Sequence, residues 1–326
     1  MLCSIFLLAK KDWFRYSNLV MNTPIYFYYP NNFSEVIDYK SGLDCWILKT
    51  YLILKKNQTK WTISIGNSIP EVGIILFHKG FFPKNRIPSY KQLFVCIQAD
   101  YGRYKYAQCH ILQNPVGLNN FKFSKKSYFE QKFFSFVQNS FIAHWNQDNI
   151  ISRDKSRGVL FENVCFYGVP QNFPKEIMTQ DFKNQLLNEG IVLKIITDST
   201  QWNDYSQTDC VLAIRDFSSK SHFNKPFSKI INGYLAGVPV IAGNESSTIY
   251  LKKNLSVDMP IVNSKEQCLA AILNLKKNYI YRLEEVQHHN LKLGIYHDDE
   301  IILEWETLIE KLQKKIYKVA EKLSYN

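Results

Sequence analysis

Residues 224–247 read NKPFSKIINGYLAGVPVIAGNESS, and this stretch decides the fold. Its apolar residues recur at helical spacing, which predicts a helix over 226–236 that Gly237 ends. The apolar run 238–242 then predicts a buried strand that ends at Gly243. A helix followed at once by a strand is typical of a doubly wound α/β domain, in which ligands bind beyond the carboxyl ends of the strands.

The same alternation extends outward from this stretch. Further strands are predicted at 164–167, 191–196, 210–214 and 260–262, and helices at 175–188 and 265–277. Toward the N-terminus, strands are predicted at 25–29, 61–65, 73–78, 92–97 and 109–112, and a helix at 42–54. Strands that alternate with helices indicate βαβ units and a mostly parallel sheet in each half.

The length of the chain points to two domains, because 326 residues exceed what one hydrophobic core usually serves. Residues 148–157 are polar and poor in apolar side chains, so we place the linker there. The expected fold class is α/β, with one doubly wound domain over 1–150 and a second over 158–297. An amphipathic helix over 298–326 is expected to pack across both domains.

The composition excludes several classes of protein. Hydrophobic residues make up 46% of the chain and charged residues 21%, which indicates a globular protein. Seven cysteines are scattered without a Cys-x-x-Cys motif, so we expect reduced thiols and neither a disulfide framework nor a zinc site. The net charge of +11 suits an anionic diphosphate substrate, an anionic membrane or nucleic acid. Nucleic acid is not expected as a partner, because the charge is diffuse and no nucleic-acid-binding motif is present.

Two segments bear on the location of the protein. The apolar run near the N-terminus is shorter than the roughly 7 to 15 residues of a signal-peptide core. No run approaches the roughly 18 apolar residues of a membrane helix, so we expect a cytoplasmic protein. The lysine-rich end of the helix over 298–326 keeps an alternative open, namely peripheral contact with the anionic inner face of a membrane.

Polar residues gather at the start of the predicted helix. A helix N-terminus offers unpaired N–H groups and a partial positive charge, which suit a phosphate group. Ser228 and Lys229 in the first turn would add a hydroxyl donor and a full cation, and Asn232 lies on the same face. Pro226 suits the first turn, because the N–H that it lacks has no partner there. The sequence therefore predicts a phosphate site at this helix start.

Loops at the ends of other strands complete the predicted donor site. Arg215 ends the strand 210–214 and would stabilise charge on a leaving diphosphate, the alternative being a salt bridge with Asp216. Trp202 or Tyr205 would flank the nucleotide base, the alternative for either being a place in the core. Glu245, with the serines that follow it, would meet a sugar or ribose hydroxyl. The predicted donor-binding residues are Gly168, Trp202, Tyr205, Arg215, Lys225, Ser228, Lys229, Asn232, Glu245, Ser246 and Ser247.

The stretch from 202 to 250 resembles the donor-binding signature of GT-B glycosyltransferases of the family 1-like type. Retaining members carry two glutamates ahead of a Gly-x-Pro, and the matching positions here are Asn224 and Asn232. The sequence from Ser228 on is closer to the Glu-Lys pattern of inverting fucosyltransferase-like enzymes, whose lysine contacts the donor diphosphate. Ser228 stands in place of the glutamate of that pattern, which leaves the identity of the sugar open. The resemblance implies the diphosphate contact for Lys229. It also implies two Rossmann-like domains that face each other across a cleft, and an enzyme of the bacterial surface-glycan type.

An inverting transfer needs a base that deprotonates the acceptor hydroxyl. Asp100 is the candidate, because the loop 98–103 leaves a predicted strand and gathers Asp100 and Arg103 around a glycine turn. The alternative is that Asp100 only forms the turn. Asn67 follows another strand and is placed with Asp100 and Arg103 on the acceptor side. His78 also ends a strand and is the second candidate base.

These patterns predict a glycosyltransferase of the hexosyltransferase type, acting in polysaccharide biosynthesis. It would move a sugar from a UDP- or GDP-sugar to a glycan or lipid-linked acceptor, with inversion and without a metal ion. Lys229, Arg215 and Asp100 would be its catalytic residues, and no cofactor besides the donor is expected. Two alternatives stay open: a sugar-nucleotide epimerase with the same fold, and a nucleotide-binding protein without turnover. A dehydrogenase is not expected, because no Gly-x-Gly-x-x-Gly follows a strand.

Overall fold

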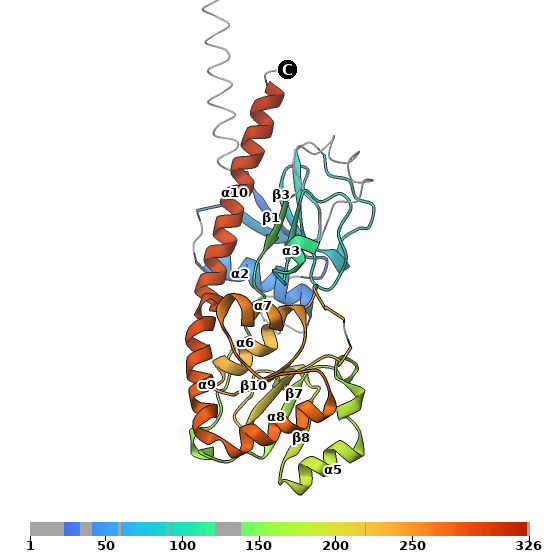
Figure 1. The fold of residues 1–326 in the computed structure, drawn as a ribbon. Helices are drawn as coiled ribbons and strands as arrows, with labels where there is room; N and C mark the ends of the chain where they lie inside the picture. Colours follow the sequence, from blue (N-terminus) through green and yellow to red (C-terminus); the bar gives the residue numbers. More distant parts are fainter. Residues whose placement is uncertain are drawn as a thin grey trace, which may run out of the picture. The chain divides into compact units, whose positions relative to one another are not determined.

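The structure is a computed structural model in which two compact units can be distinguished (Figure 1). The described residues are 23–32, 41–57, 60–89, 91–120, 138–218 and 220–324, apart from the side chains of 119–120 and 316–324. The first unit holds the residues up to 113, those of 118–142 and those from 301 onward, and the second unit holds 114–117 and 143–300. Each unit is described by itself below.

The first unit is built on a sheet of six parallel strands in the order β2-β1-β3-β4-β5-β6. The strands are β1 (Ile25–Tyr28), β2 (Ile63–Gly66), β3 (Gly73–His78), β4 (Gln92–Ile97), β5 (Cys109–Leu112) and β6 (Gln138–Phe141). Strands β3, β4 and β5 have the predicted bounds, and all their residues are buried, as expected for central strands of a parallel sheet. Strand β6 is not among the predicted strands, because its sequence is polar and half-buried.

The helices of the first unit follow the same pattern of buried faces. A π-helical turn over Asp44–Leu48 runs directly into α2 (Lys49–Lys56), and the short α3 covers Gly117–Asn120. The long α10 (Asp298–Ser324) belongs to the first unit from residue 301 onward. There Glu310 pairs with Lys60, and Lys315 donates to Gln138 at 2.7 Å. None of the described helices is both long and apolar enough to cross a bilayer.

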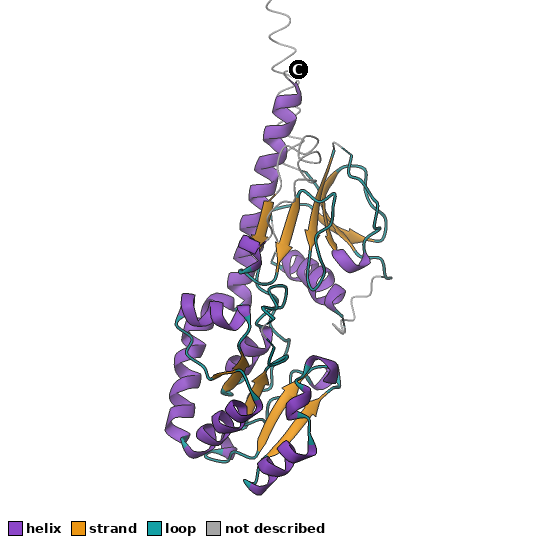
Figure 2. Cartoon of the chain, turned by 45° about the vertical axis from the view of Figure 1, so that its right-hand side comes forward, coloured by secondary structure: helices purple, strands orange, loops and turns teal. Residues whose placement is uncertain are grey.

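The second unit is built on five parallel strands in the order β11-β10-β9-β7-β8. Figure 2 shows strands in orange and helices in purple. The strands are β7 (Asn163–Tyr167), β8 (Val192–Ile196), β9 (Cys210–Ala213), β10 (Val240–Gly243) and β11 (Ile261–Val262). The helices are α5 (Gln180–Asn188), α6 (Ser228–Leu235), α7 (Ser246–Leu255), α8 (Lys265–Lys277) and α9 (Tyr279–Lys292). Every strand predicted in this half is present, with bounds that shift by at most two residues.

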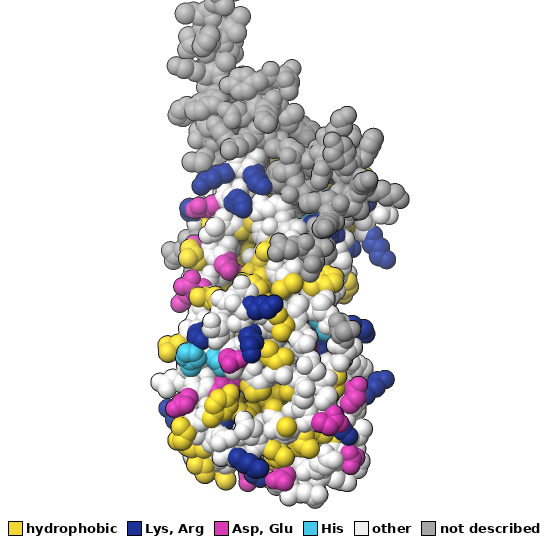
Figure 3. Space-filling view, viewed as in Figure 1, with side chains coloured by type: hydrophobic (Ala, Val, Ile, Leu, Met, Phe, Trp, Pro, Cys, Tyr) yellow, Lys and Arg dark blue, Asp and Glu magenta, His cyan; other side chains and the backbone are white. Residues whose placement is uncertain are grey.

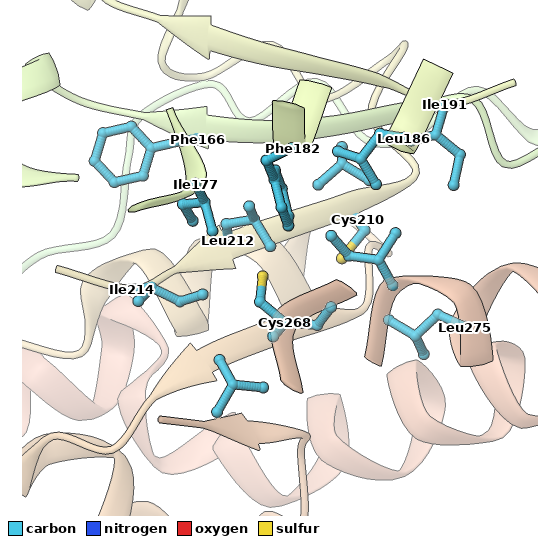
Figure 4. Close-up of a cluster of buried hydrophobic side chains, with 14 of the residues drawn as sticks. Phe166, Ile177, Phe182, Leu186, Ile191, Cys210, Leu212, Ile214, Cys268 and Leu275 are labelled. Carbon is cyan, nitrogen blue, oxygen red and sulfur yellow. The ribbon is translucent and has the colours of Figure 1, made fainter. Parts of the chain in front are cut away.

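Successive side chains along these strands point to opposite faces of the second sheet. Phe166 and Leu212 point into a core that they share with Phe182 of α5 and Cys268 of α8 (Figure 4). On the opposite face, α6 packs so closely that a Cβ on its Gly233 would lie 2.7 Å from a methyl group of Val240. Helix α6 is therefore fixed tightly against the strands, and its first turn lies at their carboxyl edge.

Two expectations about local structure are wrong. Helix α6 begins at Ser228 and not at Pro226: the N–H of Ile230 donates to the carbonyl of Phe227 at 2.9 Å, and the carbonyl of Pro226 accepts from Arg215 at 3.1 Å. Ser246 and Ser247 do not lie in a loop but are the first residues of α7. The segment lacks a clear apolar stripe, so sequence periodicity misses this helix.

Candidate functional site

The strand order of the second unit marks one place for a ligand. The chain order reverses between β7 and β9, which are neighbours in the sheet. Ligands of doubly wound sheets bind beyond the carboxyl ends of the strands at such a reversal. Gly168 directly follows β7, and Arg215 lies two residues after β9. Two of the predicted donor-binding residues therefore stand at the topological switch point.

Gly168 is required by its conformation and by its surroundings. Its φ is +147°, a value that residues with a side chain rarely adopt. A Cβ there would lie 3.1 Å from Nζ of Lys229 and 3.3 Å from the ring of Phe166. The glycine leaves room for the ammonium group of Lys229 at the end of β7.

Lys229 lies in the first turn of α6 and brings a cation to the switch point. Its Nζ lies 4.0 Å from the ring centre of Phe166, a favourable cation–π contact. Burial lowers the pKa of Lys229 to about 7, and the nearby charge of Arg215 adds to the effect. Among the described residues, no hydrogen bond or ion pair satisfies this ammonium group. An anion that entered here would restore the charge of Lys229 and bind to it.

Arg215 is held by Glu245, and this corrects two expectations. The guanidinium group of Arg215 forms an ion pair with Glu245, whose Oε1 also accepts from the Arg215 backbone N–H at 3.1 Å. The alternative pair of Arg215 with Asp216 is not formed, because Asp216 pairs with His222 at 2.9 Å. Glu245 is only 2% exposed, so its carboxylate serves Arg215 and is not presented to a sugar or ribose hydroxyl.

Two helices begin at this edge without a side-chain cap. Neither Phe227, which precedes α6, nor Glu245, which precedes α7, makes a side-chain hydrogen bond to its helix. The N–H of Ser246 donates to the carbonyl of Ser221 at 2.9 Å. Among the described residues, the N–H groups left for other acceptors are those of Ser228 and Lys229 in α6 and of Ser247 and Thr248 in α7. A small pocket joins the two helix starts to the end of β9, and its lining includes Arg215, Lys229 and Ser247. The arrangement combines two cations with two partial positive charges, which suits a diphosphate.

Three other predicted donor-binding residues are hydrogen-bonded within the protein, Asn232 and Ser246 through their side chains and Lys225 through its backbone carbonyl. Oδ1 of Asn232 accepts from the backbone N–H of Gln147 at 3.2 Å, so this side chain fixes a neighbouring segment. The carbonyl of Lys225 and the hydroxyl of Ser246 both accept from Nδ2 of Asn114, each at 3.0 Å. Asn114 is missing from the sequence prediction, and the only signal for it is an Asn-Pro pair at the end of a strand.

The two aromatic candidates for the nucleotide base differ in their surroundings. Trp202 is half-buried and donates its indole N–H to the carbonyl of Ile196 at 2.9 Å. Tyr205 is 2% exposed, and its ring packs against Tyr167 with centres 4.4 Å apart. Tyr205 therefore belongs to the core, which is the alternative stated for it, and Trp202 stays a prediction.

Surface charge does not by itself mark a site. Lysine and arginine side chains on the visible face are interspersed with acidic ones (Figure 3). Among the described residues, no three His, Cys, Asp or Glu side chains are grouped so that they could hold a metal ion. The candidate site therefore rests on the geometry around Lys229.

The acceptor-side candidates lie in the first unit. Asp100 follows β4 in a turn where Ala99 has φ of +46°, and its Oδ1 accepts from Gln113 at 2.9 Å. Arg103 donates to Asn139 at 2.5 Å. Asn67 is exposed at the end of β2. Their roles stay predictions.

His78, the second candidate base, is buried and hydrogen-bonded to the backbone. It is 3% exposed, and its Nδ1 accepts from the backbone N–H of Gly80 at 3.2 Å. Burial lowers its pKa to about 4, so the ring is neutral near pH 7 but is a weak base. The role of either residue as the base stays a prediction.

Comparison with solved structures identifies the fold. Sucrose-phosphate synthase from Thermosynechococcus elongatus is 11% identical, with a TM-score of 0.54 over 89% of this chain and 99% of that one. The Anabaena protein HepE, solved with UDP and glucose, is 9% identical, with a TM-score of 0.50 over 90% of this chain and all of that one. No family model matches the sequence, and no curated protein matches it either. The chain has the GT-B fold of glycosyltransferases.

Proposed function

We propose that the chain is a glycosyltransferase that binds a nucleoside diphosphate sugar at the carboxyl edge of the second sheet. One observation carries the proposal: the partly buried ammonium group of Lys229 stands at the switch point and forms no ion pair or hydrogen bond with any described residue, while the nearby carboxylate of Glu245 is paired with Arg215. A buried cation without an ion pair is costly, and groups perturbed in this way are frequent at functional sites.

The surroundings of Lys229 favour a diphosphate over a smaller anion. Arg215 adds a second cation, and the uncapped starts of α6 and α7 add backbone N–H donors. As the bond between sugar and phosphate breaks, negative charge grows on the leaving nucleoside diphosphate. Lys229 and Arg215 stabilise that charge from fixed positions, in a role that other enzymes give to a divalent metal ion.

The donor and acceptor are proposed at the level of chemical class. The donor is a UDP- or GDP-sugar, and HepE, of the same fold, was solved with UDP and glucose. The acceptor is a hydroxyl of a glycan or lipid-linked saccharide. Asp100 removes its proton, and the transfer inverts the anomeric centre. The enzyme belongs to cytoplasmic polysaccharide synthesis, and the lysine-rich end of α10 gives it peripheral contact with an anionic membrane.

The test compares the wild-type protein with Lys229→Ala. Calorimetric titrations with UDP, GDP and the matching nucleosides give affinities, and sugar transfer is then followed with the better nucleotide's sugars, with and without a chelator. We expect the variant to lose about 30-fold or more in diphosphate affinity, because a charge-assisted contact contributes about 2 kcal/mol. Lys252→Ala, at the exposed far end of α7, is the control and should bind as the wild type does.

Three results would contradict the proposal. Equal diphosphate affinity of Lys229→Ala and wild type would remove Lys229 from the site. Interconversion of free nucleotide sugars without an acceptor would indicate an epimerase. Nucleotide binding without transfer to any glycan or lipid-linked acceptor would indicate a binding protein.

A further inference from the structure

Asn114 follows β5 but groups with the second unit of the structure. The segment 114–117 is the part of the early chain that clusters with residues 143–300. The side chain of Asn114 is completely buried, with 0% of its surface exposed. A buried amide is stable only if its donors and acceptor find partners, so its contacts identify what it does.

Every polar atom of the Asn114 side chain has a partner. Nδ2 lies 3.0 Å from the carbonyl of Lys225, 3.0 Å from Oγ of Ser246 and 3.5 Å from the carbonyl of His222. Oδ1 accepts from the backbone N–H of Val116 at 3.0 Å, which fixes the orientation of the amide. One side chain thus ties together three groups that lie 108 to 132 residues away in the sequence.

These partners frame the candidate donor site. Lys225 precedes Pro226, whose carbonyl accepts from Arg215, and α6 begins two residues later. Ser246 is the first residue of α7, and its backbone N–H donates to the carbonyl of Ser221 at 2.9 Å. Asn114 therefore connects the loop that enters α6 with the start of α7.

The loop held by Asn114 does not have a relaxed backbone. His222 adopts φ of +47°, a conformation that costs free energy for a residue with a side chain. Such a conformation persists only where the surroundings impose it. The contacts of the His222 carbonyl with Asn114 and with the Lys225 backbone N–H, the latter at 2.8 Å, provide that constraint.

We propose that Asn114 is a positioning residue of the donor site. By holding the 221–225 segment against α7, it keeps the N-termini of α6 and α7 at the spacing that a diphosphate requires. This inference rests on the proposed function. An amide suits the task because it donates two hydrogen bonds without bringing a charge that would repel or compete for the phosphates. An aspartate of the same shape would face two carbonyl groups and a hydroxyl with a carboxylate.

The experiment uses two variants of Asn114 and one matched control in the full chain. Asn114→Ala removes the amide, and Asn114→Asp keeps its volume and its acceptor but removes the donor. The control is Asn163→Ala at the start of β7, because Asn163 is also buried and donates its amide to a loop carbonyl, that of Gln207 at 2.8 Å. Asn163 lies at the amino end of β7, whereas the switch point lies at the carboxyl end of that strand.

Two readouts separate positioning from general stability. Hydrogen exchange of the ligand-free protein should be faster in residues 221–227 and 246–249 for both Asn114 variants, and unchanged there for the control. Calorimetric titration should show about tenfold weaker binding of UDP or GDP by both Asn114 variants, with unchanged binding of the nucleoside alone. A lesion of folding would instead weaken nucleoside and diphosphate binding together.

The outcomes distinguish this inference from the proposed function. If the wild type binds neither UDP nor GDP, the proposed function fails, and the inference fails with it. If the wild type binds one of them and both Asn114 variants bind it equally well, only the inference is overturned. Unchanged hydrogen exchange in both segments would overturn it too, since the loop would then not depend on Asn114.

Discussion

The carboxyl edges of the two sheets share a topology but differ in chemistry. In each sheet the chain order reverses between the first strand and the third, β1 and β3 in the first unit, β7 and β9 in the second. At the second edge stand Lys229 and Arg215. At the first edge stand Tyr29 and His78, both buried. The same backbone arrangement thus presents two cations in one unit and a buried tyrosine and histidine in the other.

The helix starts differ in the same way. In the first unit Ser41 and Asp44 cap each other, with Oγ of Ser41 accepting from the Asp44 N–H at 3.2 Å and Oδ2 of Asp44 accepting from the Ser41 N–H at 3.0 Å. Tyr29 donates to the other oxygen of Asp44 at 2.7 Å. A helix start whose N–H groups are bonded by its own side chains has little to offer an anion. Helices α6 and α7 have no side-chain cap, and the N–H groups of their second residues, Lys229 and Ser247, stay available. Topology therefore gives the place of a site, and capping helps to decide its ligand.

The largest effect is expected from Asp100→Asn in the first unit. If Asp100 is the base, kcat of sugar transfer falls by about 10²- to 10⁴-fold, because an amide cannot take up the acceptor proton. Nucleotide affinity should not change, which calorimetry checks on the same sample. A kcat within twofold of the wild type would assign Asp100 to the turn alone.

Arg215→Ala in the second unit should weaken UDP or GDP binding by about 30- to 100-fold. The variant loses one cation and leaves the buried carboxylate of Glu245 without its partner near the phosphates. Titration calorimetry measures the change. Arg153→Ala is the control, because Arg153 pairs with Asp209 at 2.8 Å just before β9 begins, and its loss should lower stability alone. Equal loss of affinity in both variants would mean that Arg215 acts only through folding.

Diphosphate affinity should fall by up to tenfold for each pH unit above about 7.5. The free Lys229 has a pKa of about 7, and a bound anion raises it, so binding takes up a proton between these two values. Phosphate groups are fully ionised in this range and add no slope of their own. Lys229→Arg should bind with little pH dependence, because arginine stays charged. A flat wild-type profile from pH 7.5 to 9 would contradict the assignment.

The smallest effect is expected from Ser41→Ala in the first unit. Loss of this cap should lower the free energy of unfolding by about 1 kcal/mol, which denaturant titration measures. Nucleotide affinity should stay the same, because the cap belongs to the first unit. Weaker diphosphate binding by this variant would show that the capped helix start of the first unit also contributes to nucleotide binding.

Much of the fold follows from the sequence because its signals are local. Strands β3, β4 and β5 are continuous apolar runs between turn residues, and such runs are buried wherever the sheet forms. Helices α7 and α9 are not predicted from the sequence pattern. The face that α9 turns to the interior carries Arg282, Glu285 and His289, which reads as a solvated surface. Tertiary contacts satisfy only some of their polar atoms: Tyr234 donates to one oxygen of Glu285 at 2.8 Å, and the other oxygen has no partner among the described residues.

The sequence by itself determined the two-unit α/β fold and the gathering of Arg215, Lys229 and Gly168 at strand and helix ends. These properties depend on neighbours a few positions away. Only the tertiary structure decided which groups are left for a ligand. In the folded chain Arg215 forms an ion pair with Glu245, and Asn232 accepts a hydrogen bond from Gln147. Asn114, which lies 132 residues before Ser246 in the sequence, donates a hydrogen bond to it. The physical reason is that a side chain's polar atoms bind whichever partner packing brings within about 3 Å, and local periodicity carries no record of that partner.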